Sequence, residues 1–284
     1  MTYNGEYTTA TERKEIGGIC VYPITMRFYK RFIAAREAWK QRQSFLPVKY
    51  LFSPFLEATF DYMVSPEPPL TDDAPKGCFF GILEMLILAL RLDYASPDEL
   101  LRNGVILKNR PNGTFTVDKI RFVQDGELRE ITPKSFKIIR QIVADQNGIE
   151  LPDESENVDI LRSYREKQEY ERRNAQKLKA NTENVIDTVA YLSGLRTKDI
   201  MSWTVKEFEC RKSTVERVEN FRIFAQAELS GMASFKKGNP CPSLFFDVVD
   251  DTYGTASLEE ADLSMAKDQI EAARESAEQT LQRR

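Results

Sequence analysis

Two pairs of adjacent acids, Asp72-Asp73 and Asp250-Asp251, are the residues of this chain best suited to metal chemistry. Neighbouring carboxylates offer the oxygen ligands that Mg²⁺ and Ca²⁺ prefer, so one hypothesis is a carboxylate-dependent, metal-assisted enzyme. Neither pair lies in an EF-hand pattern, and adjacent side chains on a strand point to opposite sides. The alternative is that both pairs are solvated acids of surface loops. We expect no bound metal and no cofactor.

Histidine is absent from all 284 residues. Because histidine is the commonest general base near neutral pH and a common metal ligand, its absence removes Ser-His-Asp and Cys-His catalysis and most zinc sites. The chain also lacks a phosphate-binding loop, the glycine pattern of dinucleotide-binding folds and the nucleophile elbow of hydrolases. Carboxylate, lysine or tyrosine chemistry stays open, but the sequence favours a protein without catalytic residues.

The cysteines and the apolar segments indicate a soluble, intracellular protein. Four cysteines are scattered along the chain, which is typical of free thiols in a reducing compartment. The first fifteen residues are polar and predict no signal peptide. The longest apolar run, 79–92, contains Glu84 and is shorter than the roughly 20 residues of a spanning helix. We therefore expect no membrane partner.

The segment 24–50 combines positive charge with aromatic side chains. It contains seven lysine and arginine residues against the single acid Glu37. Single-stranded nucleic acid is bound by such patterns, with rings stacked on bases and cations on phosphates. The alternative is a helix whose core stripe is Phe28, Phe32 and Trp39, since these aromatics recur at helical spacing. A nucleic-acid-binding accessory factor is therefore an alternative function, although the net charge of −4 argues against general attraction to nucleic acid.

The C-terminal segment 245–284 is acidic, with ten acids against four bases. Its last helix, opened by a capping box at Ser257–Glu260, has a thin apolar face that includes Leu258 and Met265. Such a helix either frays or completes its burial on a partner. The opposite charges of segments 24–50 and 245–284 allow self-association or contact with a different partner, and ordinary surface charge is the alternative.

Helical periodicity dominates the N-terminal half of the chain. It predicts helices at about 25–44, at 77–92 and from Pro97 onward, and a second apolar segment lies at 50–63. Short alternating segments replace this pattern between 104 and 131, and the turn dipeptides Asn112-Gly113 and Asp125-Gly126 separate them. We predict a small antiparallel β-meander there, from segments at 105–108, 114–118, 120–123 and 127–131.

Helices return after the meander. Thr132-Pro133 predicts a helix start, and Asn147-Gly148 predicts its end. Thr204 and Glu207 form a capping box that opens a long helix to about Leu229. Two shorter helices are expected before it, at 182–193 and 195–202. The predicted fold class is α+β and mainly α, with the meander at about 104–131 and a C-terminal helical part.

Changes of composition divide the chain into five parts. The strongly charged, apolar-poor stretch in the middle has the character of a solvated helix and sets the main boundary. The predicted parts are a flexible arm at 1–18, a helical domain with the meander at 19–152, a charged linker helix at 153–180, a helical domain at 181–231, and an extended segment with the acidic helix at 232–284.

Several stretches resemble proteins of bacteriophage tails. The run Asp199–Phe208, the long helix ending at Ser230-Gly231 and the run Phe235–Ser243 together resemble the C-terminal part of tail-assembly chaperones from phages of Gram-positive hosts. The run Ser135–Gly148 resembles a segment of phage proteins from the same gene neighbourhood. These stretches cover about a quarter of the chain.

The resemblance implies a non-catalytic protein of the host cytoplasm or the virion. Such a protein binds the tape-measure protein or the tail-tube subunits during assembly, and the resemblance carries over no catalytic residue. Apolar residues between Trp203 and the end of the chain are then the candidates for partner binding: Trp203, Phe208, Phe245, Phe246, Leu258 and Met265.

Overall fold

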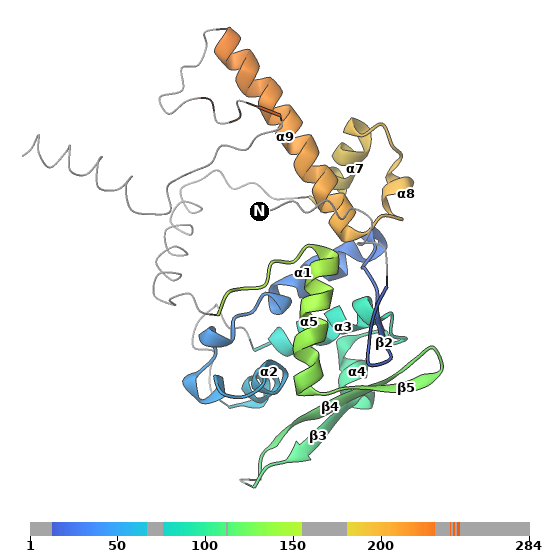
Figure 1. Cartoon of the computed structure of the whole chain (residues 1–284), viewed down its shortest axis with the longest axis vertical. Coiled ribbons are helices and arrows are strands. Elements are labelled where there is room, and N and C mark those ends of the chain that lie inside the picture. The colour runs from blue at the N-terminus through green and yellow to red at the C-terminus, as the bar shows by residue number, and fades with distance from the viewer. Residues whose placement is uncertain are drawn as a thin grey trace, which may run out of the picture. The chain divides into compact units, whose positions relative to one another are not determined.

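The computed structural model describes residues 13–66, 76–111, 113–154 and 181–230, together with 239, 241, 243 and 244. The chain forms two compact units, Met1–Val215 and Glu216–Arg284. Helices and two small antiparallel sheets build the first unit (Figure 1). The prediction of an α+β fold that is mainly α is confirmed.

The first sheet is a hairpin of β1 (Lys14–Ile16) and β2 (Ile19–Val21). Gly17 and Gly18 connect its strands, both with positive φ, which glycine adopts without strain. The predicted flexible arm is therefore wrong for residues 14–18, because β2 is buried in the core and β1 pairs with it. Residues 1–12 of that arm lie outside the described residues.

A buried glutamine fastens the hairpin to the rest of the core. The Gln124 side chain accepts a hydrogen bond from Cys20 N–H at 2.8 Å. Its amide donates to Cys20 O at 2.8 Å and to Leu90 O at 2.9 Å. These bonds satisfy the side-chain amide and three backbone groups that burial would otherwise leave unpaired.

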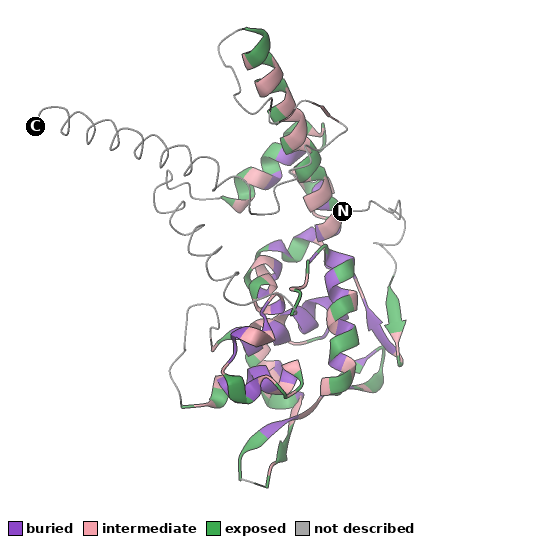
Figure 2. Ribbon diagram, turned by 60° about the vertical axis from the view of Figure 1, so that its left-hand side comes forward, coloured by how far each residue is buried: buried purple, intermediate pink, exposed green. Residues whose placement is uncertain are grey.

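The central layer contains α1 (Tyr29–Trp39) and α3 (Cys78–Leu90). A 3₁₀ turn at Met26–Phe28 precedes α1. Helix α3 carries apolar side chains on nearly all of its faces. Such a helix is stable only when it is buried on all sides, and most of its residues are buried (Figure 2). The two helices approach closely at Gly81, where a Cβ atom would lie 2.4 Å from the Ala38 Cβ.

The predicted helix at 25–44 is shorter than expected, and the apolar segment at 50–63 is helical only in its second part. The structure has 3₁₀ turns at Gln43–Phe45 and Val48–Tyr50 and starts α2 (Phe55–Val64) only after Pro54, because proline is best tolerated at a helix start. The end of α1 is set by Arg140, whose guanidinium donates to the Trp39 and Gln41 carbonyls at 2.8 Å each. The following helix, α4 (Pro97–Asn103), begins at the predicted proline, and the Ser96 side chain caps it by accepting from Glu99 N–H.

The predicted meander is present as β3 (Val105–Asn109), β4 (Phe115–Gln124) and β5 (Glu127–Ile131), in the order β3-β4-β5. The segments predicted at 114–118 and 120–123 form one strand. The register moves from Ile106↔Lys119 to Leu107↔Val117, so Asp118 is an extra residue, a β-bulge that interrupts the alternation along β4.

Helix α5 (Pro133–Asn147) has the predicted bounds. Thr132 and Ser135 cap its start reciprocally, and Gly148 ends it with φ +66°. Its buried face, Phe136, Ile139 and Val143, belongs to the main core. The remaining described helices are α7 (Thr182–Leu192), α8 (Thr197–Ile200) and α9 (Val205–Leu229).

The main core runs through both helical domains that the sequence predicts as separate. Ile186, Val189, Ile200, Val205 and Phe208 are buried together with side chains of α1, α3 and α5. The boundary between the two compact units follows Val215, within α9. Residues 181–215 thus complete the N-terminal core, while the predicted linker between 155 and 180 lies outside the described residues.

Candidate interaction surface

Helix α7 buries one face and exposes its C-terminal end. Asn181 caps its start by accepting from Glu183 N–H at 3.0 Å, and Ile186, Val189 and Ala190 face the core. Tyr191 and Leu192 follow directly but fall outside this stripe, because each residue turns the helix by about 100°. They are therefore directed away from the core.

Three apolar side chains at this end are open to solvent. Tyr191 is 83% exposed, Leu192 43% and Leu195 37%. Scattered exposed apolar residues are ordinary, whereas neighbouring ones mark contact sites more often. We call Tyr191, Leu192 and Leu195 the α7 surface.

The backbone that carries the α7 surface is well determined by local hydrogen bonds. Gly194 has φ +67°, Leu195 N–H donates to Ala190 O at 2.9 Å, and Gly194 N–H donates to Tyr191 O at 3.1 Å. This pair of bonds is the Schellman motif, which ends a helix and fixes the following residue. The three side chains are thus presented by an ordered turn.

Short polar contacts join the turn to α8. Thr197 Oγ1 donates to Asp187 Oδ1 at 2.9 Å. Arg196 and Asp199 form an ion pair at 3.1 Å, which lowers the pKa of the Asp199 carboxyl chiefly through its hydrogen bond with the Arg196 side chain. Asp199 also accepts from Arg196 N–H. These contacts order the connection between α7 and α8, although exposed pairs add little to stability.

The start of α9 is bound to the N-terminal segment. Thr25 and Thr204 form an isolated antiparallel bridge. Met26 N–H donates to Trp203 O at 2.9 Å, and Val205 N–H donates to Ile24 O at 2.8 Å. The capping box of Thr204 and Glu207 is present as predicted, with Glu207 N–H donating to Thr204 Oγ1 at 3.2 Å.

A tyrosine on α1 completes this junction. The Tyr29 ring packs edge-on against Phe208, with centroids 5.4 Å apart. Its hydroxyl donates to Glu209 Oε1 at 2.5 Å. Burial, and then the bond to this carboxylate, raise the pKa of Tyr29 well above its ordinary value. The hydroxyl therefore stays protonated and binds Glu209 throughout the neutral range.

The six predicted partner-binding residues fall into three groups: one is buried, one is partly buried, and four are not described by the structure. Phe208 is fully buried, so it belongs to the core and offers no surface to a partner, contrary to its selection as a candidate. Trp203 is partly buried and packs against the main core. Phe245, Phe246, Leu258 and Met265 lie outside the described residues. The α7 surface was not predicted; the signal that reveals it is apolar residues off the buried stripe of a helix.

The aromatic residues of segment 24–50 are mostly in the core. Tyr29, Phe32, Trp39, Phe45 and Tyr50 are buried, and Phe28 is partly exposed. Rings in these positions are not free to stack on bases. The core-stripe alternative is thus correct for Phe32 and Trp39.

Cations of the same segment form ionic contacts within the protein. Lys30 lies 2.7 Å from Glu183, and Arg36 lies 3.4 Å from Glu37. Arg31 pairs with Glu84, the acid in the apolar helix α3. Phosphates would have to compete with these carboxylates, so the geometry does not favour the nucleic-acid alternative.

The acid pairs that opened the enzymatic alternative, Asp72-Asp73 and Asp250-Asp251, lie outside the described residues. Within the described ranges no three potential metal-ligating side chains come together. None of the helices described is both long and apolar enough to span a membrane.

Comparison with protein-family models, with curated proteins and with solved structures gives no match.

Proposed function

We propose that this chain is a non-catalytic interaction protein of phage tail assembly. It binds the tape-measure or tail-tube protein through the α7 surface, in the host cytoplasm or within the virion. The observation that carries the proposal is the α7 surface itself: Tyr191, Leu192 and Leu195 are exposed on an ordered turn.

The energy available at this surface is sufficient for an anchor. Covering a large apolar side chain yields roughly 1.5–3 kcal/mol, and a few well-packed anchors, tyrosine among the commonest, dominate most interfaces. Because the turn is already ordered, little conformational entropy is lost on binding. The resemblance to tail-assembly chaperones supports the choice of partner, since the run Asp199–Phe208 follows the α7 surface directly.

Co-expression with tagged tape-measure and tail-tube proteins tests this proposal. The full-length chain is expected to be retained by one of them. Tyr191→Ser together with Leu192→Ser should reduce retention at least about tenfold, which is the loss of about 1.4 kcal/mol. The matched control is Val123→Ser, which removes an apolar side chain of 60% exposure from the β-sheet.

Three outcomes are informative. If the α7 variant is no longer pulled down while Val123→Ser still is, both the proposed function and the α7 surface are supported. If both variants are still pulled down, the proposed function stands and the α7 surface is rejected as the binding site. Failure of the wild-type chain to bind either protein rejects the phage-tail function.

A further inference from the structure

Strand β3 is an edge of the three-stranded sheet, which has the order β3-β4-β5. The far end of the β3–β4 ribbon extends past the neighbouring helices in both ribbon views (Figures 1 and 2). Leu107, Lys108 and Asn109 are exposed there. An exposed edge strand presents backbone groups to which another strand can bind.

The register shows which backbone groups face outward. Arg121 N–H donates to Gly104 O at 2.7 Å, and Arg110 N–H donates to Thr114 O at 2.8 Å. In an antiparallel ladder only alternate residues bond to a given neighbour, so even-numbered residues of β3 face β4. The N–H and C=O groups of Val105, Leu107 and Asn109 therefore point away from the sheet, and no described residue binds them.

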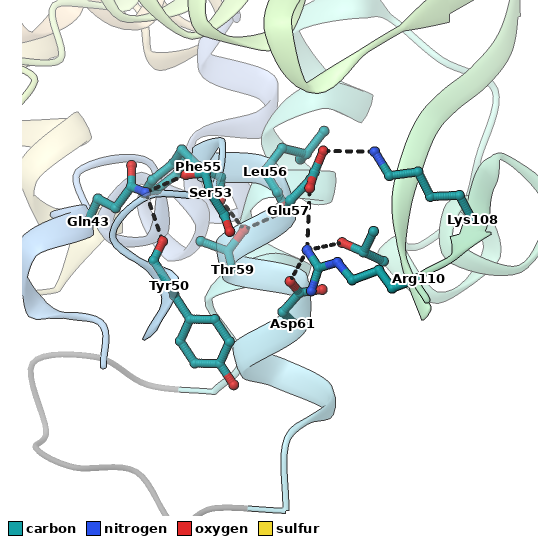
Figure 3. A network of polar contacts seen from close by, with 11 residues as sticks. Gln43, Tyr50, Ser53, Phe55, Leu56, Glu57, Thr59, Asp61, Lys108 and Arg110 are labelled. Carbon is teal, nitrogen blue, oxygen red and sulfur yellow. Dashed lines mark hydrogen bonds and ion pairs between the residues drawn. The ribbon is translucent and has the colours of Figure 1, made fainter. Parts of the chain in front are cut away.

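Charged side chains on an edge strand normally discourage pairing with another strand. On β3 and just after it, these side chains form ion pairs within the protein (Figure 3). Lys108 Nζ lies 3.1 Å from Glu57 Oε1 on α2. Arg110 Nη2 lies 2.8 Å from Asp61 Oδ2 and 3.4 Å from Glu57 Oε2. Lys108 and Arg110 are thus neutralised on the face that α2 covers.

The opposite face of the ribbon is apolar at the same level. Leu107 is 44% exposed and Phe115 57%. Phe115 pairs with Asn109, two residues from Leu107 on the same strand face, so Leu107 and Phe115 are diagonal neighbours. A strand added at β3 would cover Leu107 while bonding to the outward backbone groups.

We propose that β3 pairs antiparallel with β3 of a second copy of this chain, about a two-fold axis at Leu107. Residues 105, 107 and 109 then face 109, 107 and 105 of the partner, and the three pairs exchange about six main-chain hydrogen bonds. The two Leu107 side chains meet on one face. The result is a continuous six-stranded sheet across the dimer.

A second copy fits this edge for two reasons. Its own β3 supplies outward backbone groups in the same alternation and one apolar residue at the centre, as a self-complementary contact requires. It also introduces no uncompensated charge, because Lys108 and Arg110 of each copy remain paired with Glu57 and Asp61. The pairing of five-residue strands covers less than a standard interface, so the dimer is weak and concentration-dependent.

Site-specific cross-linking tests the proposed axis. Leu107→Cys, in a full-length chain with Cys210 and Cys241 replaced by serine, places two thiols within disulfide reach across the two-fold axis, since paired Cα atoms lie about 5.5 Å apart. Mild oxidation is expected to give covalent dimers. The control is Val123→Cys in the same background, which is exposed on β4 and distant from the axis.

Sedimentation of the reduced wild-type chain at up to about 1 mM tests the affinity. Leu107→Lys should weaken dimerisation at least tenfold by placing like charges at the axis. Asn109→Pro should do the same by removing an outward N–H donor, a change that an edge strand tolerates. Circular dichroism must show both variants folded. A wild-type chain that stays monomeric, a dimer that both variants keep, or equal cross-linking at Val123 would overturn the proposal.

Discussion

At the scale of single residues, Arg110 supplies the counter-charge of a buried carboxylate, that of Asp61. Asp61 is buried, and its carboxylate lies 2.8 Å from the Arg110 guanidinium. Arg110→Met should lower the free energy of unfolding by about 3 kcal/mol, because it leaves a buried carboxylate without its counter-charge. Adding Asp61→Leu should recover part of this loss by removing that charge.

Urea denaturation of the three chains measures these differences. The control is Arg121→Met, whose partner Glu130 lies at the sheet surface 2.8 Å away; such exposed pairs contribute little to stability. Equal losses for Arg110→Met and Arg121→Met would contradict the assigned role of Asp61.

Tyr29 should make the free energy of unfolding decrease at alkaline pH. Its folded pKa is raised by burial and by the bond to Glu209, whereas an unfolded tyrosine has a pKa of about 10. The stabilisation is complete below pH 10. It is lost as the pH rises above that value, by up to about 1.4 kcal/mol per pH unit, because only the unfolded chain releases the proton.

Tyr29→Phe removes this dependence. The difference in unfolding free energy between wild type and Tyr29→Phe should therefore shrink between pH 10 and pH 11, as measured by urea denaturation at each pH. Tyr191→Phe retains the Tyr29–Glu209 pair and should follow the wild type. A constant difference for Tyr29→Phe would show that the pKa of Tyr29 is not raised in the folded protein.

At the scale of elements, the contact between α1 and α3 requires a glycine. Gly81→Ala would place a Cβ 2.4 Å from the Ala38 Cβ and should cost about 1–3 kcal/mol through overpacking. Ala38→Gly in the same chain removes the opposing methyl and should restore most of the thermal midpoint. Gly77→Ala, where a Cβ meets nothing within 4 Å, is the control. Failure of the double variant to recover would place the strain elsewhere.

Elements with local signals were predictable, and those determined by distant contacts were not. Thr132, Gly148 and Thr204 mark helix ends through their own hydrogen bonds and backbone angles, so the sequence predicts the bounds of α5 and the start of α9 well. The β1–β2 hairpin was missed because its order depends on Gln124, about a hundred residues further on. The α7 surface was not predicted, because helical periodicity indicates the buried stripe of α7, and Tyr191 and Leu192 lie beside that stripe.

At the scale of the whole molecule, the predicted boundary at 153–180 does not separate two cores. Charge and composition indicate a solvated stretch, but they carry no information about which helices pack together across it. The contacts of Tyr29 with Phe208 and of Ile24 with Val205 cross that stretch. Such contacts are not readable from one sequence, because each requires the positions of two distant segments.

A core variant distinguishes one cooperative unit from two. Phe208→Ala should destabilise the first unit by about 3–5 kcal/mol and lower the unfolding midpoint reported by Trp39, which is fully buried near α5. The measurement is tryptophan fluorescence in urea, in a chain with Trp203→Phe so that Trp39 alone reports. Leu229→Ala, in the second unit and almost fully exposed, is the control. An unchanged Trp39 midpoint would mean that residues 181–215 fold as a separate domain.

The junction of Tyr29 with Phe208 has a consequence for synthesis on the ribosome. Helix α1 leaves the exit tunnel early, but Phe208, which covers its first turn, is added some 180 residues later. At about 5–20 residues per second, the nascent chain exposes this part of its core for roughly ten to forty seconds. During that interval the unfinished core exposes apolar surface of the kind that makes incomplete chains prone to aggregate, and this part of the core closes only when the start of α9 emerges.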